Sequence, residues 1–262
     1  MAVLSARGVT LSFGERTLFA PADFEIQNGE KVGLIGANGC GKTTLLRTLS
    51  GALPPLGGEV LLEGRPLHSY GRKELARKAA YLPQVREVPE ITAEALVSHG
   101  RFPHLGFSRK MTARDRAAVE EAIALTGIEP LRHKNLKALS GGERQRVYLA
   151  MAIAQETDLV LLDEPGTYLD IGSRFEVMAI AKKLCDRGSA VILTLHDLSD
   201  ALSFSDRLCL MDRSGRICAD GSPDAVYASG LLDEVFGVAA EAVTLQDGRQ
   251  QYVFLPRTSD MH

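Results

Sequence analysis

The chain has 262 residues, with 30 Lys and Arg against 33 Asp and Glu, so its net charge is −3. This length suits one large domain or two small ones, and the charge balance excludes a uniformly basic nucleic-acid-binding protein. The longest apolar run, residues 147–154, is far shorter than the ~20 residues of a membrane-spanning helix. We expect no secretory signal in residues 1–9, and hence a cytoplasmic protein whose four cysteines remain free thiols.

The first third of the chain alternates strand and helix signals. Residues 2–28 are rich in β-forming side chains and are interrupted at Phe13 and Gly14. A short buried strand is predicted over residues 31–35, followed by a glycine-rich turn over 36–41 and a helix from about 42 to 51. Residues 54–70 again indicate strands and turns.

The remainder predicts a helical segment followed by a parallel sheet. Residues 86–156 have helical character, with Thr92 and Thr112 as N-caps. Apolar strands over 159–162 and 190–195 enclose a helix over 175–185, a spacing typical of a parallel α/β sheet. Ser222-Pro223-Asp224 is a helix start, and Asp247-Gly248 predicts a hairpin between residues 242–245 and 250–255.

The glycine-rich turn carries a phosphate-binding pattern. Gly36-Ala37-Asn38-Gly39-Cys40-Gly41-Lys42-Thr43 fits G-x-x-x-x-G-K-[ST]. Small glycines let backbone N–H groups approach phosphate oxygens, and the following helix N-terminus adds a favourable dipole. Lys42 is placed to reach β- and γ-phosphates, and the Thr43 hydroxyl to bind Mg²⁺. A strand before and a helix after the turn favour this reading over an ordinary turn.

Two further runs carry chemistry. The strand over 159–162 ends in Asp163 and Glu164, which predicts a carboxylate that holds Mg²⁺ through water and a second that polarises an attacking water. Alone, the pair could be the acidic end of an ordinary strand. Leu139-Ser140-Gly141-Gly142-Glu143-Arg144-Gln145 opens a long helix, whose N-terminus could bind a second anion or be a simple capped start.

Together these motifs resemble ATP-binding cassette (ABC) ATPases in order and spacing over residues 1–220, and the run 139–145 is close to diagnostic for them. The resemblance implies an α/β fold: a P-loop NTPase (RecA-like) core with an antiparallel β subdomain and an inserted α-helical subdomain at about 86–156. The ABC ATPase domain would span residues 1–220, and a C-terminal extension, residues 221–262, would pack on it.

The resemblance also implies roles for single residues. Phe13 would stack on adenine, where the family usually has Tyr, although a core aromatic is the alternative. Gln84 would touch Mg²⁺ and the attacking water, His196 would contact the γ-phosphate, and Asp170 would carry communication across a dimer. Gly166 replaces the usual Thr, which we expect to loosen the loop without loss of chemistry.

These inferences predict the residues of the site. The expected catalytic residues are Glu164, His196, Gln84 and Lys42. The expected Mg²⁺ ligands are Thr43, Gln84 and Asp163. The expected ATP-binding residues are Phe13, Gly36, Asn38, Gly39, Cys40, Gly41, Lys42, Thr43, Thr44, Ser140, Gly141 and Gly142. For Cys40 we also predict a lowered thiol pKa, so that alkylation blocks ATP hydrolysis and ATP protects.

The resemblance further implies partners. Two copies would bind head to tail with ATP between the cradle and the opposing Ser140, on polytopic permease subunits at the cytoplasmic face of the inner membrane. A substrate-binding protein would act upstream, and no nucleic acid is involved. Gly100-Arg101-Phe102-Pro103-His104 resembles a segment of importer ATPases for iron–siderophores, haem and cobalamin. The alternative is an ATPase of a cytosolic assembly, such as iron–sulfur cluster biogenesis. A purely regulatory nucleotide-binding module would lack Glu164 or His196, and both are present here.

Overall fold

The protein is built around two sheets and a hairpin. The computed structural model describes residues 2–13, 16–84, 87–106, 110–246, 248 and 250–256, with the backbone alone for 11–13 and 16–21. The larger sheet has the order β10-β9-β3-β8-β7-β6. Its strands are β3 (Lys31–Gly36), β6 (Ala79–Leu82), β7 (Leu159–Leu162), β8 (Ala190–Thr194), β9 (Arg207–Met211) and β10 (Ile217–Gly221).

The larger sheet is parallel except at one edge, which confirms the sheet type expected from the sequence. Strands β6, β7, β8, β3 and β9 pair in parallel, and β10 joins β9 in antiparallel register. All residues of β3, β7 and β8 are buried. Because parallel strands end at the same edge, the loops after β3, β6, β7 and β8 converge there.

Successive side chains of the central strands point to opposite faces of the sheet and enter two separate hydrophobic cores. Leu159 and Leu161 of β7 pack with the interior of the smaller sheet, whereas Val160 and Leu162 pack against helices on the other face. A sheet that is covered on both faces has continuously apolar strands, which explains the uninterrupted run in β7. Polar side chains therefore occur where the strand ends, at Asp163 and Glu164.

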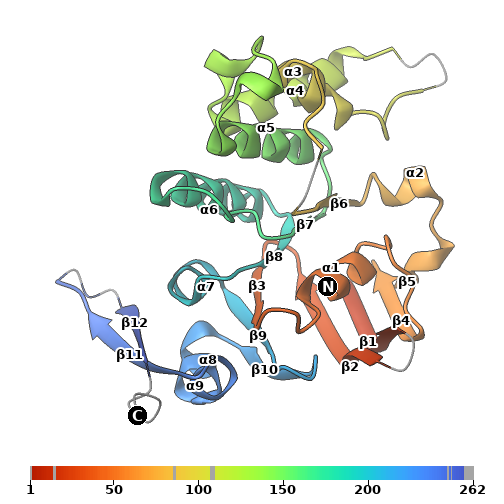
Figure 1. Ribbon diagram of the computed structural model, residues 1–262. Coiled ribbons are helices and arrows are strands. Elements are labelled where there is room, and N and C mark those ends of the chain that lie inside the picture. The colour runs from red at the N-terminus through yellow and green to blue at the C-terminus, as the bar shows by residue number, and fades with distance from the viewer. Residues whose placement is uncertain are drawn as a thin grey trace.

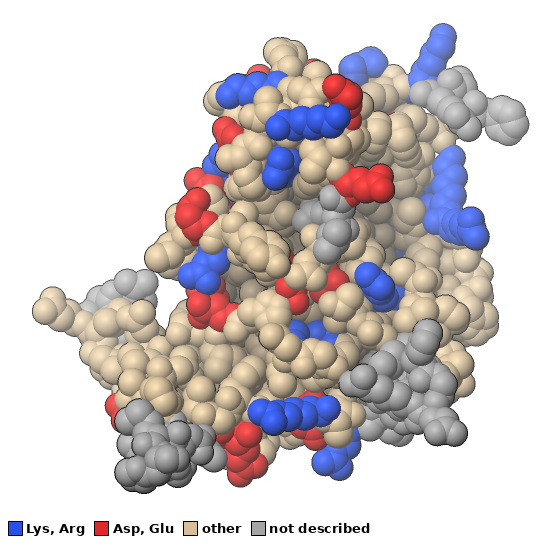
Figure 2. Space-filling model, in the orientation of Figure 1, with Lys and Arg blue, Asp and Glu red and all other residues tan. Residues whose placement is uncertain are grey.

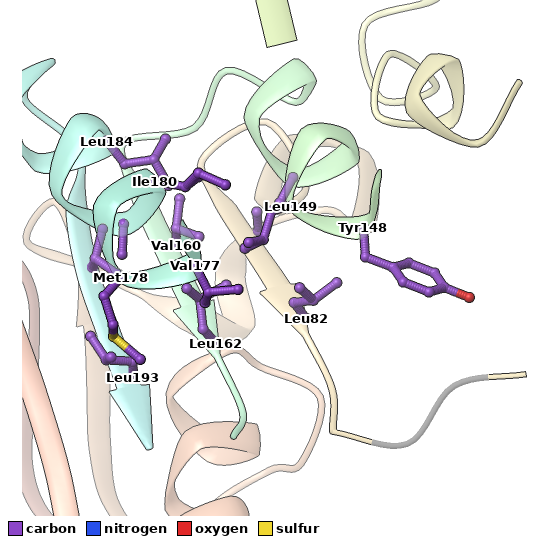
Figure 3. Close-up of a cluster of buried hydrophobic side chains, with 14 of the residues drawn as sticks. Leu82, Tyr148, Leu149, Val160, Leu162, Val177, Met178, Ile180, Leu184 and Leu193 are labelled. Atoms are coloured by element: carbon purple, nitrogen blue, oxygen red, sulfur yellow. The ribbon is translucent and has the colours of Figure 1, made fainter. Parts of the chain in front are cut away.

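The helix-covered face is shown in Figure 3. Leu82 of β6, Val160 of β7 and Leu193 of β8 lie beneath side chains of α5 (Gly141–Ala154) and α6 (Ile171–Asp186), among them Leu149 and Val177. These side chains are almost completely withdrawn from solvent, and each contributes roughly 1.5–3 kcal/mol of transfer free energy. This packing fixes both helices on one face of the sheet.

The smaller sheet is antiparallel, as the resemblance to ABC ATPases implied. Its order is β2-β1-β4-β5, and Figure 1 places it beside α1. Its elements are β1 (Ala2–Phe13), β2 (Arg16–Gln27), β4 (Gly57–Leu62) and β5 (Arg65–Pro66), and α1 spans Lys42–Leu49. Leu45 and Leu46 of α1 are fully buried in the core that α1 shares with this sheet.

A group of helices stands at the top of Figure 1, above the parallel sheet. It contains α3 (Ala93–His99), α4 (Ala113–Thr126) and α5, which follow the short α2 (Arg72–Leu75). The two predicted N-caps are confirmed: Thr92 Oγ1 accepts the N–H of Ala95, and Thr112 forms a capping box with Asp115. Helix α6 begins earlier than the predicted residue 175 because Asp170 caps it at Ser173.

Arg101 is buried inside this helical group, with only 1% of its surface exposed. Its Nε atom donates to Asp115 at 3.1 Å, and its Nη1 atom donates to the Ala154 carbonyl at 2.6 Å and to Glu156 at 2.9 Å. Hydrogen bonds from Thr112, followed by those from Arg101, lower the pKa of Asp115 to about 2. The charge of Arg101 is therefore fully paired, which its burial requires.

The C-terminal part adds α7 (Leu198–Phe204), α8 (Pro223–Ala228), α9 (Leu231–Phe236), and a hairpin of β11 (Val238–Thr244) and β12 (Gln250–Pro256). Ser222 caps α8 and Pro223 is its first residue, as predicted. The predicted hairpin is confirmed by the antiparallel pairing, although Asp247 lies outside the described residues. Tyr252 fastens the hairpin to the body, donating its hydroxyl to Asp224 at 2.8 Å.

The surface mixes both signs of charge. On the face drawn in Figure 2, acidic and basic side chains are interspersed among uncharged residues, in keeping with the near balance of the composition. Within the described part of the chain, no helix is both long enough and apolar enough to cross a membrane.

The buried pairing of Arg101 generates a stability prediction. Arg101→Met leaves Asp115 and Glu156 without their partner, so we expect the free energy of unfolding to fall by about 3 kcal/mol. Arg114→Met is the matched control, because the Arg114 side chain is 83% exposed and lies 3.7 Å from the same Glu156; we expect a change below about 0.5 kcal/mol. Urea unfolding measures both, and equal losses would contradict the role of Arg101.

Candidate functional site

The glycine-rich turn joins the end of β3 to α1 and is held by close packing. A Cβ atom on Gly36 would lie 2.5 Å from the Met211 carbonyl oxygen and 2.8 Å from Cys40 Sγ, so only glycine fits. Gly41 precedes the helix with φ of 105°, a conformation that favours glycine. Asn38 and Gly39 are exposed at the tip of the turn, which leaves their backbone accessible to a ligand.

Lys42 and Thr43 begin α1 and face different partners. The Nζ atom of Lys42 donates to the carbonyls of Gly36 at 2.8 Å and Ala37 at 3.2 Å, and the residue is only 5% exposed. A buried ammonium held at the mouth of an exposed turn is a concentrated positive charge beside the helix N-terminus. The Thr43 hydroxyl donates to Asp163 at 3.0 Å, and Thr44 lies one residue further along α1.

Cys40 departs from its predicted chemistry. Its side chain is buried, with the residue 2% exposed, and it packs in the core shared with the smaller sheet. Burial raises the pKa of the Cys40 thiol, and the opposing effect of Lys42 is smaller. The predicted reactive thiolate is therefore wrong: the side chain points behind the turn, away from the exposed face of Asn38.

Asp163 is the buried acceptor at the centre of the site, with 1% of its surface exposed. Its Oδ1 atom accepts the hydroxyls of Thr43 and Thr194, both at 3.0 Å, and its Oδ2 atom accepts the Tyr81 hydroxyl at 3.3 Å. These donors come from α1, β8 and β6, so one carboxylate joins three elements. Carboxylate and hydroxyl oxygens are the ligands that Mg²⁺ prefers, and one or two carboxylates suffice when phosphates supply the rest.

Glu164 follows directly and has a left-handed backbone, with φ of 49°. Such a backbone in a residue other than glycine stores strain and is typical of functional sites. The N–H of Glu164 donates to Thr194 Oγ1 at 2.7 Å, which holds the backbone in this conformation. Its side chain is 9% exposed.

The Glu164 carboxylate gathers three polar partners. One oxygen accepts the Gln84 side-chain amide and, at 3.1 Å, the Thr167 hydroxyl. The other oxygen contacts the Nε2 atom of His196, whose side chain is 41% exposed. A half-exposed histidine and a shielded carboxylate that follow neighbouring strands at the same edge can together orient a water molecule against an entering ligand.

The run beginning at Ser140 forms a second, separate group. Ser140 caps α5 by accepting the Glu143 N–H, and Glu143 bonds back to the Ser140 N–H. A Cβ atom on Gly142 would lie 2.4 Å from Ser173 Oγ, so this glycine allows α5 to approach the start of α6. Ser140 and Gly141 remain exposed, which leaves the helix N-terminus open to a ligand.

The loop before α6 completes this second group. Asp170 accepts the backbone N–H of Ser173 at 2.8 Å and its hydroxyl at 3.1 Å, and these bonds lower the pKa of Asp170. Three apolar side chains are exposed around Asp170: Tyr168 (97%), Ile171 (64%) and Phe175 (51%).

The structure thus sorts the predicted residues into two groups. Lys42, Thr43, Gln84, Asp163, Glu164 and His196 meet at the carboxyl-terminal edge of the parallel sheet, and Ser140, Gly141, Gly142 and Asp170 lie at the meeting of α5 and α6. The backbone of Phe13 ends β1, but its side chain lies outside what the structure describes.

Sequence reasoning missed Tyr81, Thr167 and Thr194. Tyr81 and Thr194 are single polar residues in apolar strands and belong to no recognisable motif. Thr167 lies in the run Thr167-Tyr168-Leu169-Asp170, in which only Asp170 had been given a role. The available signal was for Thr194, a hydroxyl near the end of the predicted strand over residues 190–195. That this strand lies beside β7 is known only from the structure.

Comparison with known proteins agrees with this arrangement. A family model described as "ABC transporter" matches residues 19–167. The probable siderophore transport system ATP-binding protein YusV of Bacillus subtilis (strain 168) is 38% identical over 240 residues, covering 91% of this chain and 87% of that protein. The hemin import ATP-binding protein HmuV of Streptomyces coelicolor is 40% identical over 238 residues, covering 90% and 84%.

A solved structure of a protein assigned to the metal-chelate type of ABC transporter, in an inward-facing conformation, matches with a TM-score of 0.85 at 23% identity. It covers 99% of this chain and 100% of the solved chain. The protein belongs to the ATP-binding subunits of ABC transporters, whose P-loop NTPase fold it shares. As a member of that family it binds and hydrolyses ATP.

The burial of Cys40 reverses the alkylation prediction. Cys218 is only half-buried, whereas the other cysteines are buried. We therefore expect iodoacetamide to modify native protein first at Cys218, with ATP hydrolysis unchanged, and Cys218→Ser to remove this fast reaction. Mass spectrometry of time points identifies the site, and first modification at Cys40 would contradict the burial argument.

Proposed function

We propose that this chain is the subunit that hydrolyses ATP to power an importer of iron chelates of the siderophore or haem type. The observation that carries the proposal is the meeting of Lys42, Thr43, Asp163, Glu164 and His196 at one sheet edge. The printed names of the two relatives, a siderophore transport and a hemin import protein, support the substrate class.

The phosphates of ATP would bind at the N-terminus of α1. The exposed turn from Gly36 to Gly41 offers backbone N–H groups, and the Lys42 ammonium would move from the Gly36 carbonyl to the β- and γ-phosphates. Thr43, Gln84 and Asp163 would hold Mg²⁺, which neutralises charge on the phosphates when bound. Phe13 would stack on adenine, and Cys40, buried behind the turn, would contribute its backbone only.

Glu164 would polarise the attacking water. When ionised, the carboxylate only accepts hydrogen bonds, so it can draw a proton from the attacking water. Gln84 and His196 hold its two oxygens in place meanwhile. His196 is half-exposed, and from that position its ring can donate to a γ-phosphate oxygen. The shielding of Glu164 strengthens each of these electrostatic contacts relative to water.

A second copy of the chain would complete each site. Ser140 and Gly141 are exposed at the N-terminus of α5, yet they belong to the group around α6 rather than to the cradle. The exposed Tyr168, Ile171 and Phe175 around Asp170 are the kind of apolar surface that an interface covers. A head-to-tail dimer would bring Ser140 of one copy to the ATP on the other.

Permease subunits would dock on the helical group. Phe102 is 55% exposed, and Arg101 is buried directly behind it, so the turn presents an apolar side chain on a rigid base. His104 Nε2 lies 2.8 Å from the Gln155 carbonyl and fixes the end of the same turn. The subunit would sit peripherally at the cytoplasmic face of the membrane, with a substrate-binding protein on the far side.

The proposal also divides the chain. The ABC ATPase domain would span residues 1–220 with its helical insertion at about 86–156, and residues 221–262 would be an extension packed on it. Val226, Leu232 and Tyr252 support this division, because they join the same buried cluster as the helix-covered face of β7.

The central test uses the carboxylate of Glu164. Glu164→Gln keeps the shape of the side chain but removes its charge, so we expect ATP affinity within about threefold of wild type and turnover reduced at least ~100-fold. The variant should also form a stable dimer with ATP, visible by light scattering. Lys42→Ala is the contrasting variant, for which we expect weaker ATP binding as well.

The transport assignment is tested by the subunits that co-purify. Liposomes that contain the polytopic membrane subunits together with this chain should take up a ferric siderophore or haem when ATP is supplied. Liposomes that contain the Glu164→Gln complex should not. Wild-type turnover in Glu164→Gln would refute the role of Glu164. Co-purification with soluble scaffold proteins instead would refute the importer and favour a cytosolic assembly.

A further inference from the structure

Arg174 stands where the loop before α6 meets the segment after β8. It lies in the first turn of α6, and its backbone N–H donates to the Asp170 carbonyl at 3.0 Å. Its Nη1 atom donates to Asp197 Oδ2 at 3.1 Å and lies 3.4 Å from Asp200 Oδ2. The Arg174 side chain is 27% exposed, so this ion pair is partly shielded from solvent.

Asp197 is the residue directly after His196. Its two oxygens have different partners: Oδ1 accepts the Asp200 N–H and caps α7, while Oδ2 accepts Arg174. The position of the His196 backbone is therefore fixed on its C-terminal side by a helix cap and by a cation from α6. Because the ring of His196 contacts Glu164, a shift of Asp197 would change that contact.

The stem of Arg174 also lies beside the loop that follows Glu164. A Cβ atom added at Gly166 would lie 3.5 Å from Cγ and 3.6 Å from Cδ of Arg174, so the two are separated by a space that a methyl group would fill. Thr167, the next residue, donates to Glu164 at 3.1 Å. A cavity of about 520 Å³ lies between these segments, lined among others by Glu164, Gly166, Arg174 and His196.

We propose that Arg174 is a positioning residue for ATP hydrolysis, which holds the His196 segment and the loop after Glu164 in register through its ion pair with Asp197. Arg174 belongs neither to the expected site residues nor to any of the motifs described above. It touches no reacting atom; it acts through His196 and Glu164. The inference therefore rests on the proposed roles of those two residues.

The charges around the pair support this assignment. Asp197 and Asp200 are two carboxylates at the start of α7, and burial followed by the charge of Asp197 raises the pKa of Asp200, which Arg174 opposes. Without Arg174, like charges would repel across the start of α7. The guanidinium thus offsets this repulsion at the segment that carries His196.

The test compares the steady-state kinetics of variants at Arg174, at its partner Asp197 and at a control arginine. We expect Arg174→Gln to lower kcat about tenfold with KM for ATP within about twofold, because a shielded charge-assisted bond is lost without a nucleotide contact. Arg174→Lys should recover part of kcat, since an ammonium can still pair with Asp197. Arg187→Gln is the matched control, with the same change at the other end of α6, and should leave kcat unchanged.

Asp197→Asn supplies the decisive cycle. Asparagine still caps α7 but loses the charge that Arg174 pairs with, so this variant and the Arg174→Gln/Asp197→Asn double variant should show the same loss as Arg174→Gln alone. If the losses of kcat from the two substitutions multiply in the double variant, the proposal is overturned. An unchanged kcat in Arg174→Gln would also overturn it. The proposal would also be overturned if the loss of kcat disappeared once each rate was divided by the fraction of folded protein measured by thermal unfolding.

Failure of this inference is distinguishable from failure of the proposed function. Glu164→Gln is measured beside the Arg174 variants under the same conditions. If Glu164→Gln abolishes turnover while Arg174→Gln does not, the proposed function stands and the positioning role fails. If Glu164→Gln keeps wild-type turnover, the proposed function fails, and with it the basis on which Arg174 was assigned.

Discussion

The parallel alignment of β3, β6, β7 and β8 is the constraint on which the site depends. Strands that run in the same direction end at one edge, so the residues that follow them are close in space although far apart in sequence. The Asp163 carboxylate exploits this edge, accepting hydroxyls from α1 and β8 and from Tyr81 of β6. These hydrogen bonds join α1, β6 and β8 in one polar network at that edge.

Burial of the sheet on both faces determines where that chemistry can occur. The central strands have no solvent-facing side on which to place charges, because one face packs on α5 and α6 and the other on α1 and the smaller sheet (Figure 1, Figure 3). Charged groups therefore collect beyond the strand ends, where backbone N–H groups and hydroxyls satisfy them. The left-handed backbone at Glu164 marks the point at which strand geometry gives way to this network.

Contiguous motifs were readable from the sequence because their residues are neighbours along the chain. Strand, turn and helix around Lys42, and the capped starts at Thr92, Thr112 and Ser222, needed no knowledge of distant residues. Thr194 and Arg174 were missed because their partners are 31 and 23 residues away and only the fold brings them together. A sequence pattern records spacing, and it does not record which strand lies beside which.

For Cys40, an argument from the helix dipole alone gave the wrong direction for the shift of the thiol pKa. The helix dipole that favours a thiolate contributes roughly 0.3–1 kcal/mol, whereas full desolvation of a charged group can shift its pKa by several units. The sequence showed the dipole, but the packing of Cys40 between Gly36 and the core appears only in the structure. At Cys40 burial therefore outweighs the dipole.

The most direct test of the account is whether Asp163 holds the metal that accompanies ATP. Manganese titrated into ATP-loaded Glu164→Gln protein, followed by electron paramagnetic resonance, measures that affinity without turnover. Asp163→Asn in this background keeps oxygen acceptors for Thr43 and Thr194 but removes the charge. We expect the manganese affinity to fall at least ~10-fold, while circular dichroism shows that the fold is intact. Unchanged affinity in the folded variant would contradict it.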